Sequence, residues 1–309
     1  MVSFRGETNQ LNKATRSQAP GQFVSLVDGM VHYEMVGPAD AQTVVLVHGF
    51  SVPYYIWDPT FAALTEAGFR VLRYDLYGRG YSDRPDVVYG QDLYDRQLVN
   101  LLQALHIEKP VDLVGLSMGG PIATTFTDRH PSQVRRLMLI DPAGFTSQKA
   151  WSARLIQMPV LGEWLLNWFG DKILVSKLDQ DFYQPAQLAQ FTKKYRTQMQ
   201  YKGFKRALLS TLRSGILGDL GQTFFRVGQQ KRPVLLIWGE HDHTVPFALN
   251  EKVRAAIPHA EFHAIAQAAH IPHYERPEIV NPILLRFLSN ELDKPTANDV
   301  GEILSETDA

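Results

Sequence analysis

The sequence of 309 residues contains no cysteine. Disulfide bonds, cysteine-ligated zinc, iron–sulfur clusters and thiol nucleophiles are therefore excluded. Long apolar stretches are also missing, and the polar first 21 residues lack the apolar segment of a secretion signal. We expect no transmembrane segment, and the lack of cysteine agrees with a cytoplasmic location.

A strong charge of one sign is the next feature that is missing. The chain has 31 Lys and Arg against 32 Asp and Glu, which gives a formal net charge of −1. Because proteins that bind nucleic acids present basic surfaces, we expect no nucleic-acid partner. Hydrophobic residues make up 45% of the chain and charged residues 20%. This composition permits a large buried core and excludes disorder of the whole chain.

Short apolar runs alternate with segments of helical spacing along most of the chain. Strands are expected at 23–27, 30–36, 43–47, 70–74, 111–114, 137–140, 234–238 and 261–265, and helices at 57–67, 92–105, 119–129, 247–256 and 277–292. An Asp-Gly turn makes the first two strands a hairpin. The alternation predicts an α/β fold: an eight-stranded, mostly parallel sheet with helices on both faces.

The alternation stops between residues 145 and 230, where helical patterns and three tryptophans occur without a strand pattern. We interpret residues 146–228 as a helical cap over the carboxyl ends of the strands, inserted into a core formed by 23–145 and 229–292. The polar residues 1–22 are expected to form a partly disordered leader, and 293–309 a polar tail.

The strongest local motif is Gly115-Leu116-Ser117-Met118-Gly119. It follows an expected strand and precedes an expected helix, which is the context in which G-x-S-x-G forms a nucleophile elbow. In such a turn, glycines on either side leave room for the chain, and the helix amino terminus adds a positive dipole beneath the serine. The motif predicts that Ser117 is a nucleophile.

A serine hydroxyl needs a base to become a good nucleophile. His270 lies on the loop after the last expected strand, directly after the small residues Ala268 and Ala269. His273 is the rival candidate for the base, and we interpret it as structural. Asp242 follows the strand at 234–238 and is expected to orient the imidazole of His270.

The residues around Asp242 also allow a metal-binding interpretation. Glu240, His241, Asp242 and His243 are consecutive. Neighbouring residues on a turn point in different directions, and no separated ligand set accompanies them, so we expect no metal.

Hydrolysis of an acyl group also requires donors for the developing oxyanion. The backbone N–H groups of Met118 and Phe50 are the candidates, one in the elbow and one in the loop after the third strand. His48 begins that loop and is expected to order it through hydrogen bonds. The glycine-rich segment Asp75–Ser82 lacks the spacing of a phosphate-binding loop and is interpreted as a structural turn.

From about Phe23 to Leu292 the chain resembles the α/β-hydrolase-fold serine hydrolases. The resemblance rests on VLVHGF, the D-x-x-G-x-G-x-S turn, GLSMGG and the chain order serine, aspartate, histidine. HGFS, SMGG and the DPAG segment at 141–144 are similar to carboxylesterases and monoacylglycerol-lipase-like enzymes. The resemblance implies hydrolysis of a small-molecule ester with an uncharged, apolar acyl group, through an acyl-enzyme and without a cofactor.

Two alternatives remain open. Meta-cleavage-product C–C bond hydrolases use the same triad but usually carry Trp directly after the catalytic histidine, where this chain has Ile271, and the glycine common before that histidine is Ala269 here. A homologue that only binds ligands would normally have lost a triad residue, and none is missing.

The cap sequence at 155–169 is mostly apolar. It predicts a lid helix that packs its apolar side on the core, or one that lines an acyl pocket or makes transient contact with a membrane surface. The oligomeric state does not follow from the sequence.

Overall fold

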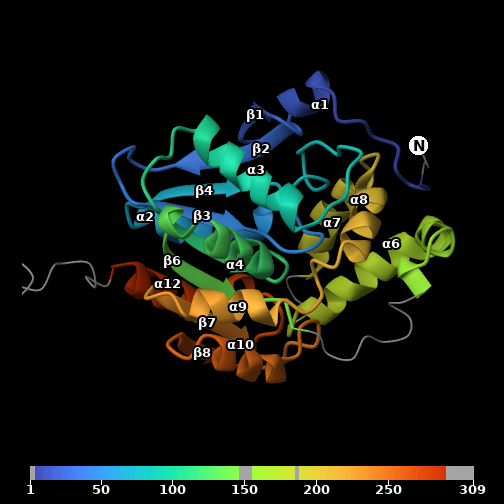
Figure 1. The fold of residues 1–309 in the computed structure, drawn as a ribbon. Helices are drawn as coiled ribbons and strands as arrows, with labels where there is room; N and C mark the ends of the chain where they lie inside the picture. Colours follow the sequence, from blue (N-terminus) through green and yellow to red (C-terminus); the bar gives the residue numbers. More distant parts are fainter. Residues whose placement is uncertain (1–3, 146–154, 185–187, 290–309) are drawn as a thin grey trace, which may run out of the picture.

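The computed structural model describes residues 4–145, 155–184 and 188–289. An eight-stranded sheet lies at its centre (Figure 1). The strands are β1 (Gln22–Leu26), β2 (Gly29–Val36), β3 (Thr43–Val47), β4 (Arg70–Tyr74), β5 (Val111–Leu116), β6 (Val134–Ile140), β7 (Val234–Gly239) and β8 (Glu261–Ile265). All eight predicted strands are confirmed.

The strand order is β1-β2-β4-β3-β5-β6-β7-β8. β2 pairs antiparallel with both β1 and β4, whereas every pair from β4 to β8 is parallel. The carboxyl ends of the parallel strands therefore meet along one edge of the sheet, which is where ligands bind in open α/β sheets.

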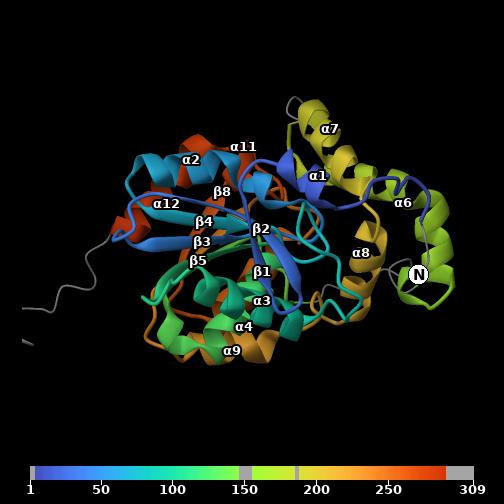
Figure 2. The same ribbon diagram turned by 90° about the horizontal axis from the view of Figure 1, so that it is seen from above.

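Helices cover both faces of the sheet (Figures 1 and 2). One face carries α3 (Gln91–Ala104), α4 (Gly119–Arg129), α9 (Gly221–Gly228) and α10 (Asn250–Ala256); the other carries α2 (Asp58–Glu66), α11 (Pro272–Glu275) and α12 (Pro277–Ser289). Short 3-10 helices lie at η1 (Tyr54–Trp57), η2 (Pro131–Gln133) and η4 (Phe247–Leu249).

The β3 strand shows why the central strands are apolar throughout. Val45 and Val47 belong to the hydrophobic cluster beneath α3 and α4, whereas Val44 and Leu46 belong to the cluster beneath α2 and α12. Since successive side chains of a strand point to opposite faces, a strand covered on both faces buries every residue.

The insertion is helical, as predicted. Its helices α6 (Leu161–Asp181), α7 (Leu188–Met199) and α8 (Phe204–Arg213) lie beside the sheet (Figure 1). The buried positions of α6 recur at every fourth residue, namely Gly162, Leu166, Gly170, Leu174 and Leu178. This spacing places them on one side of the helix, and the opposite side leaves large aromatic rings exposed.

The exposed rings include two of the three cap tryptophans. Trp164 and Trp168 are about half exposed, at 52% and 56%, and the third, Trp151, lies outside the described residues. No helix in the described part of the chain is long and apolar enough to cross a membrane.

The α9 helix lies with the core rather than with the cap helices. It packs between α4 and α10, and its Phe224 and Val227 are buried in the same cluster as the central strands. Residues 221–228 therefore differ from the other cap helices in that they pack on the core. The cap boundary at residue 228 stays a prediction.

The leader is more ordered than its polar sequence suggests. It contains α1 (Lys13–Ser17), which begins with a capping box formed by Asn12 and Thr15. Phe4 is buried against Leu166 of α6. The carboxylate of Glu7 accepts the backbone N–H groups of Gly203 and Lys205, before and within α8. Residues 4–9 therefore lie along the cap.

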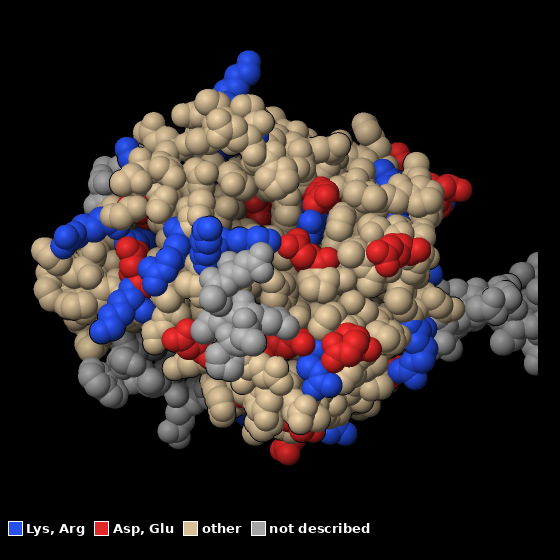
Figure 3. Space-filling model, turned by 180° about the vertical axis from the view of Figure 1, so that it is seen from behind, with Lys and Arg blue, Asp and Glu red and all other residues tan. Residues whose placement is uncertain are grey.

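Both signs of charge occur on the face opposite that of Figure 1. Figure 3 shows Lys and Arg side chains gathered toward the side of the cap, with Asp and Glu side chains beside and below them. Such mixing on this face accords with the near-zero net charge of the chain.

Candidate active site

Ser117 lies on the turn between β5 and α4 with a φ of 52°, a left-handed conformation that costs energy for any residue with a side chain. A Cβ atom on Gly115 would lie 2.3 Å from the carbonyl oxygen of Gly119, and one on Gly119 would lie 2.2 Å from that of Val47. Only glycine fits at these two positions, so the strained turn predicted from the motif is present.

The side chains of Ser117, His270 and Asp242 form one hydrogen-bonded chain. His270 Nε2 lies 2.8 Å from Ser117 Oγ, and His270 Nδ1 lies 2.7 Å from Asp242 Oδ2. Asp242 Oδ1 accepts the backbone N–H groups of Thr244 and Val245 at 2.8 and 2.9 Å. A nucleophile, a base and a group that orients the base are thus in direct contact, which is the arrangement of a catalytic triad.

The three side chains come from the ends of three neighbouring strands. Ser117 follows β5, Asp242 follows β7 and His270 follows β8, and all three are buried. Parallel pairing therefore brings together residues that are 125 and 28 positions apart in the sequence.

The electrostatics around His270 favour its protonated form. Burial alone would lower its pKa, but the carboxylates of Asp242 and Asp181 raise the pKa of His270 above its ordinary value. Asp181 ends α6; its carboxylate accepts the hydroxyl of Thr244 at 2.5 Å, and its backbone carbonyl accepts the N–H of His270. The cap thus contacts the loop that carries the proposed base.

The rival His273 lies elsewhere. It is on α11, where its Nε2 is 3.2 Å from the carbonyl of Ile56 and its ring contacts Trp57. Burial lowers the pKa of His273 to about 3, so the ring is neutral at physiological pH. These contacts agree with the structural role predicted for it.

His48 orders its loop, as predicted. Its Nε2 accepts the N–H of Leu76 at 2.9 Å, and its Nδ1 lies 2.9 Å from the carbonyl of Gly49. The neighbouring Asp75 accepts the N–H groups of Tyr54 and Tyr81 and so closes the turn after β4.

The two proposed oxyanion donors lie on either side of Ser117. A Cβ on Gly49 would lie 3.2 Å from Ser117 Cβ, so the loop that carries Phe50 passes directly over the serine. Met118 precedes the first residue of α4. Among the described residues, no acceptor for the N–H of Phe50 or of Met118 is present. Neither N–H group is thus engaged by another described residue, as an oxyanion donor requires.

The predicted absence of a metal site can be examined at two places. Of the consecutive residues 240–243, only Asp242 is buried and the others are exposed, so they do not converge. Asp141, Asp242 and His270 do converge, with one donor atom each within 4.8 Å of one another. However, both ring nitrogens of His270 already have hydrogen-bond partners, which is the pattern of a triad rather than of a ligand set.

A cavity of about 430 Å³ opens in front of Ser117 and His270. Its lining is mostly apolar and comes from both halves of the molecule. The core contributes Phe50, Val52, Ala143 and Val245, and the insertion contributes Ile156, Leu166, Leu174 and Leu217. The expectation that part of the 155–169 segment lines a pocket is thus confirmed.

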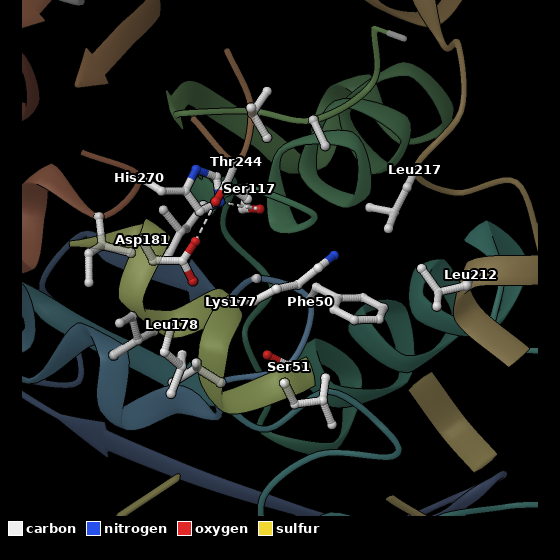
Figure 4. A pocket seen from close by; sticks show the side chains of 18 of the residues that line it. Phe50, Ser51, Ser117, Lys177, Leu178, Asp181, Leu212, Leu217, Thr244 and His270 are labelled. Carbon is white, nitrogen blue, oxygen red and sulfur yellow. Dashed lines mark hydrogen bonds between the residues drawn. The ribbon is translucent and has the colours of Figure 1, made fainter. Parts of the chain in front are cut away.

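Two charged residues of α6 also line the cavity, and sequence reasoning missed both. Figure 4 shows Lys177 reaching from the helix into the cavity and Asp181 beside Thr244. Lys177 is the single Lys or Arg among the described lining residues, and its charge acts on the carboxylate of Asp181, one turn further along the helix. The spacing of four residues between Lys177 and Asp181 was the available signal, since it places both on one side of a helix.

Comparison with known proteins assigns the family. Residues 42–277 match the family model described as alpha/beta hydrolase fold. The chain belongs to this family. It is a hydrolase with the α/β-hydrolase fold and a helical insertion.

A curated relative from Paraburkholderia phymatum is named 2-hydroxy-6-oxononadienedioate/2-hydroxy-6-oxononatrienedioate hydrolase. It is 29% identical over 87% of this chain and 96% of its own length. A solved meta-cleavage product hydrolase from Pseudomonas fluorescens has a TM-score of 0.74 at 21% identity and covers 88% of this chain and 98% of its own. The enol-lactonase from Burkholderia xenovorans has a TM-score of 0.75 at 24% identity and covers 87% and 100%.

These relatives change the expected branch of the family. The carboxylesterase and monoacylglycerol-lipase-like branches, which the short motifs favour, are not specifically supported, and several of the curated relatives carry the names of dienedioate hydrolases. Motifs such as HGFS and SMGG build the elbow and the oxyanion loop, which all these enzymes need. They therefore indicate the fold and the triad better than they indicate the substrate.

Proposed function

We propose that this chain hydrolyses the carbon–carbon bond of a 2-hydroxy-6-oxo-dienoate, with Ser117 as nucleophile, His270 as base and Asp242 as the residue that orients it. The observation that carries the proposal is Lys177, the single Lys or Arg among the described residues that line a mostly apolar cavity in front of Ser117 and His270. Such a cavity suits an apolar conjugated chain that ends in a carboxylate. The names of the curated relatives support the same substrate class.

The first steps follow from the hydrogen-bonded chain. Transfer of the 2-hydroxyl proton of the substrate to carbon 5 gives a diketone. Ser117 Oγ then attacks the 6-oxo carbon while its proton moves to His270 Nε2, 2.8 Å away. The negative charge of Asp242 stabilises the imidazolium, and the N–H groups of Phe50 and Met118 stabilise the oxyanion.

The bond between carbons 5 and 6 breaks when the oxyanion collapses. Its electron pair moves along the conjugated chain to the 2-oxygen, which takes the proton held by His270. The acyl group remains on Ser117. His270 then takes a proton from a water molecule that attacks this group, and returns the proton to Ser117 Oγ as the Oγ–acyl bond breaks and a carboxylic acid leaves. In this pathway Lys177 faces the end of the substrate that carries the carboxylate and the developing dienolate charge.

Ester hydrolysis is the second candidate function, and Ile271 favours it. This residue lines the cavity where meta-cleavage-product hydrolases usually carry Trp, so one contact that is common in those enzymes is missing. The same triad and oxyanion donors would cleave an ester of an apolar acyl group, with the alcohol as the leaving group.

A substrate panel tests the proposal. We expect kcat/KM for 2-hydroxy-6-oxo-dienoates to exceed that for p-nitrophenyl esters of several acyl lengths and for an enol lactone, and we expect EDTA to leave the activity unchanged. Faster turnover of the esters would favour the second candidate. Labelling of Ser117 by a fluorophosphonate without turnover of any ester or dienoate would contradict both, and an activity lost with EDTA and restored by zinc would refute the metal-independent triad.

A further inference from the structure

A second buried carboxyl group lies against the triad. Asp141 directly follows β6, the strand between β5 and β7, and it is completely buried. One oxygen of its carboxyl group, one of Asp242 and one ring nitrogen of His270 all lie within 4.8 Å of one another. The proposed mechanism uses Asp242 and His270 but gives no role to Asp141.

The two oxygens of Asp141 have different environments. Oδ1 accepts the backbone N–H of Gly239 at 2.9 Å, whereas Oδ2 is buried and accepts no hydrogen bond from any described residue; the side chain that faces the carboxyl group is that of Asp242. The backbone of Asp141 has a φ of 43°, a left-handed conformation. A residue in this conformation whose buried oxygen has no donor is costly to retain, which indicates a role beyond packing.

Among the described residues, the cation that acts on this group of acids is Lys177, one helical turn before Asp181, and it acts on Asp181. The titratable side chains that face it are Asp242 after β7, His270 after β8, Asp181 at the end of α6 and Glu275 on α11. Apart from His270 these four are acidic, and the charged groups that act on Asp141 itself within the described ranges are the carboxyl groups of Asp242 and Glu275. Two adjacent buried carboxylates cannot both stay ionised, so one of them holds a proton.

The different surroundings of Asp141 and Asp242 decide which of the two carboxyl groups holds the proton. Both oxygens of Asp242 already have partners: Oδ1 accepts two backbone N–H groups, and Oδ2 faces His270. Asp141 accepts one N–H; burial and the charge of Asp242 raise the pKa of Asp141 well above its ordinary value. The proton therefore belongs on Asp141.

We propose that Asp141 is a positioning residue of the triad: its carboxylic acid donates a hydrogen bond to the Asp242 carboxylate, and it supplies the negative charge beside His270 when Asp242 is neutralised. The inference rests on the proposed function, because it assumes that Ser117, His270 and Asp242 act as a triad. It extends that function with a second acid, which the sequence analysis did not identify as part of the site.

Asp141→Asn is the sharpest variant to test this role. Asparagine tolerates the left-handed conformation, and its side-chain oxygen can still accept the N–H of Gly239. Its amide can donate to Asp242 as the acid does, but it cannot ionise. The substitution therefore removes the negative charge that Asp141 could supply, and it retains the hydrogen bonds to Gly239 and Asp242.

The experiment is a double-mutant cycle of the wild type, Asp141→Asn, Asp242→Asn and the double variant. The measurement is the rate of Ser117 labelling by a fluorophosphonate between pH 6 and pH 9, which needs no natural substrate. In the wild-type background we expect Asp141→Asn to slow labelling about threefold, whereas in the Asp242→Asn background we expect about tenfold or more, because contacting residues couple.

The pH profile gives an independent readout. Labelling of every variant should rise with pH as His270 loses its proton. In Asp242→Asn the like charge beside Asp141 is gone, so Asp141 ionises more readily and the rate should rise further with pH than in the double variant, which retains only the rise due to His270. Equal slowing by Asp141→Asn in both backgrounds, or identical pH profiles of Asp242→Asn and the double variant, would overturn the inference. Circular dichroism confirms folding of each variant. A wild-type protein that is not labelled at Ser117 would instead refute the proposed nucleophile.

Discussion

The cavity has two walls of different origin. The core wall carries Ser117, Asp242 and His270 at the ends of three paired strands, and their side chains bond directly to one another. The cap wall is largely α6, which contributes apolar side chains together with Lys177 and Asp181. Backbone hydrogen bonds between paired strands fix the core wall in place, whereas the position of the cap wall depends on the packing of a helix.

This difference suggests that the core wall carries out the reaction, whereas the cap wall selects the substrate. A nucleophile and its base must be positioned to within a fraction of an ångström, and neighbouring strands of one sheet provide that rigidity. A substrate pocket can change with the residues on one face of a helix while the triad stays intact. We therefore expect substitutions in the core wall to abolish turnover, and substitutions in the cap wall to change which substrates are accepted.

The largest expected effect concerns the two histidines near the core wall. His270→Ala should lower kcat by about 10⁴-fold or more, because it removes the base beside Ser117. His273→Ala is the matched control, since this histidine is equally buried but contacts Ile56 and Trp57. We expect it to retain the chemistry.

Steady-state kinetics on variants shown to be folded by circular dichroism and by their melting temperatures make this comparison. An inactive His273→Ala beside an active His270→Ala would reverse the assignment of the base.

A smaller effect is expected at the cap wall. Lys177→Met should raise KM for a dienoate about 10- to 100-fold, the value of one charge-assisted hydrogen bond of roughly 1.5–3 kcal/mol. Hydrolysis of an uncharged p-nitrophenyl ester should change much less. Lys172→Met is the control, because Lys172 is exposed on the same helix and does not line the cavity. Equal losses on charged and uncharged substrates would mean that Lys177 does not recognise a carboxylate.

The smallest expected effect concerns the influence of Asp181, in the cap wall, on the pKa of His270, in the core wall. His270 acts as a base only when neutral, so kcat/KM should fall as the pH drops through its pKa, which lies above the ordinary value for histidine. The charge of Asp181 contributes to that increase. Asp181→Asn should therefore move the acidic limb of the pH profile to lower pH, by about 0.5 unit or roughly 0.7 kcal/mol.

The control for this change is Asp179→Asn, since Asp179 is exposed two residues earlier on α6. A limb that shifts equally in both variants would indicate a general effect of surface charge rather than contact between the cap and the base.

The sequence by itself determined the sheet, the elbow and the order of the triad. All eight strands could be predicted because short apolar runs and the turn residues between them are local signals. Ser117 could be predicted because its motif contains the whole strained turn. Asp242 and His270 could be predicted because the carboxyl ends of parallel strands meet at one edge, so residues that follow such strands become neighbours.

Only the tertiary structure decided the rest. The leader was expected to be loose, yet Phe4 and Glu7 pack on the cap through contacts with residues more than 150 positions away. The sequence does not distinguish Lys177 from other lysines, and only the position of α6 beside the cavity does so. Likewise, the sequence shows only that Asp141 follows a strand; the position of β6 between β5 and β7 brings it next to Asp242 and His270. A charged side chain acquires its role from the groups that surround it, and here those groups come from distant parts of the chain that meet only when the sheet and the cap have packed together.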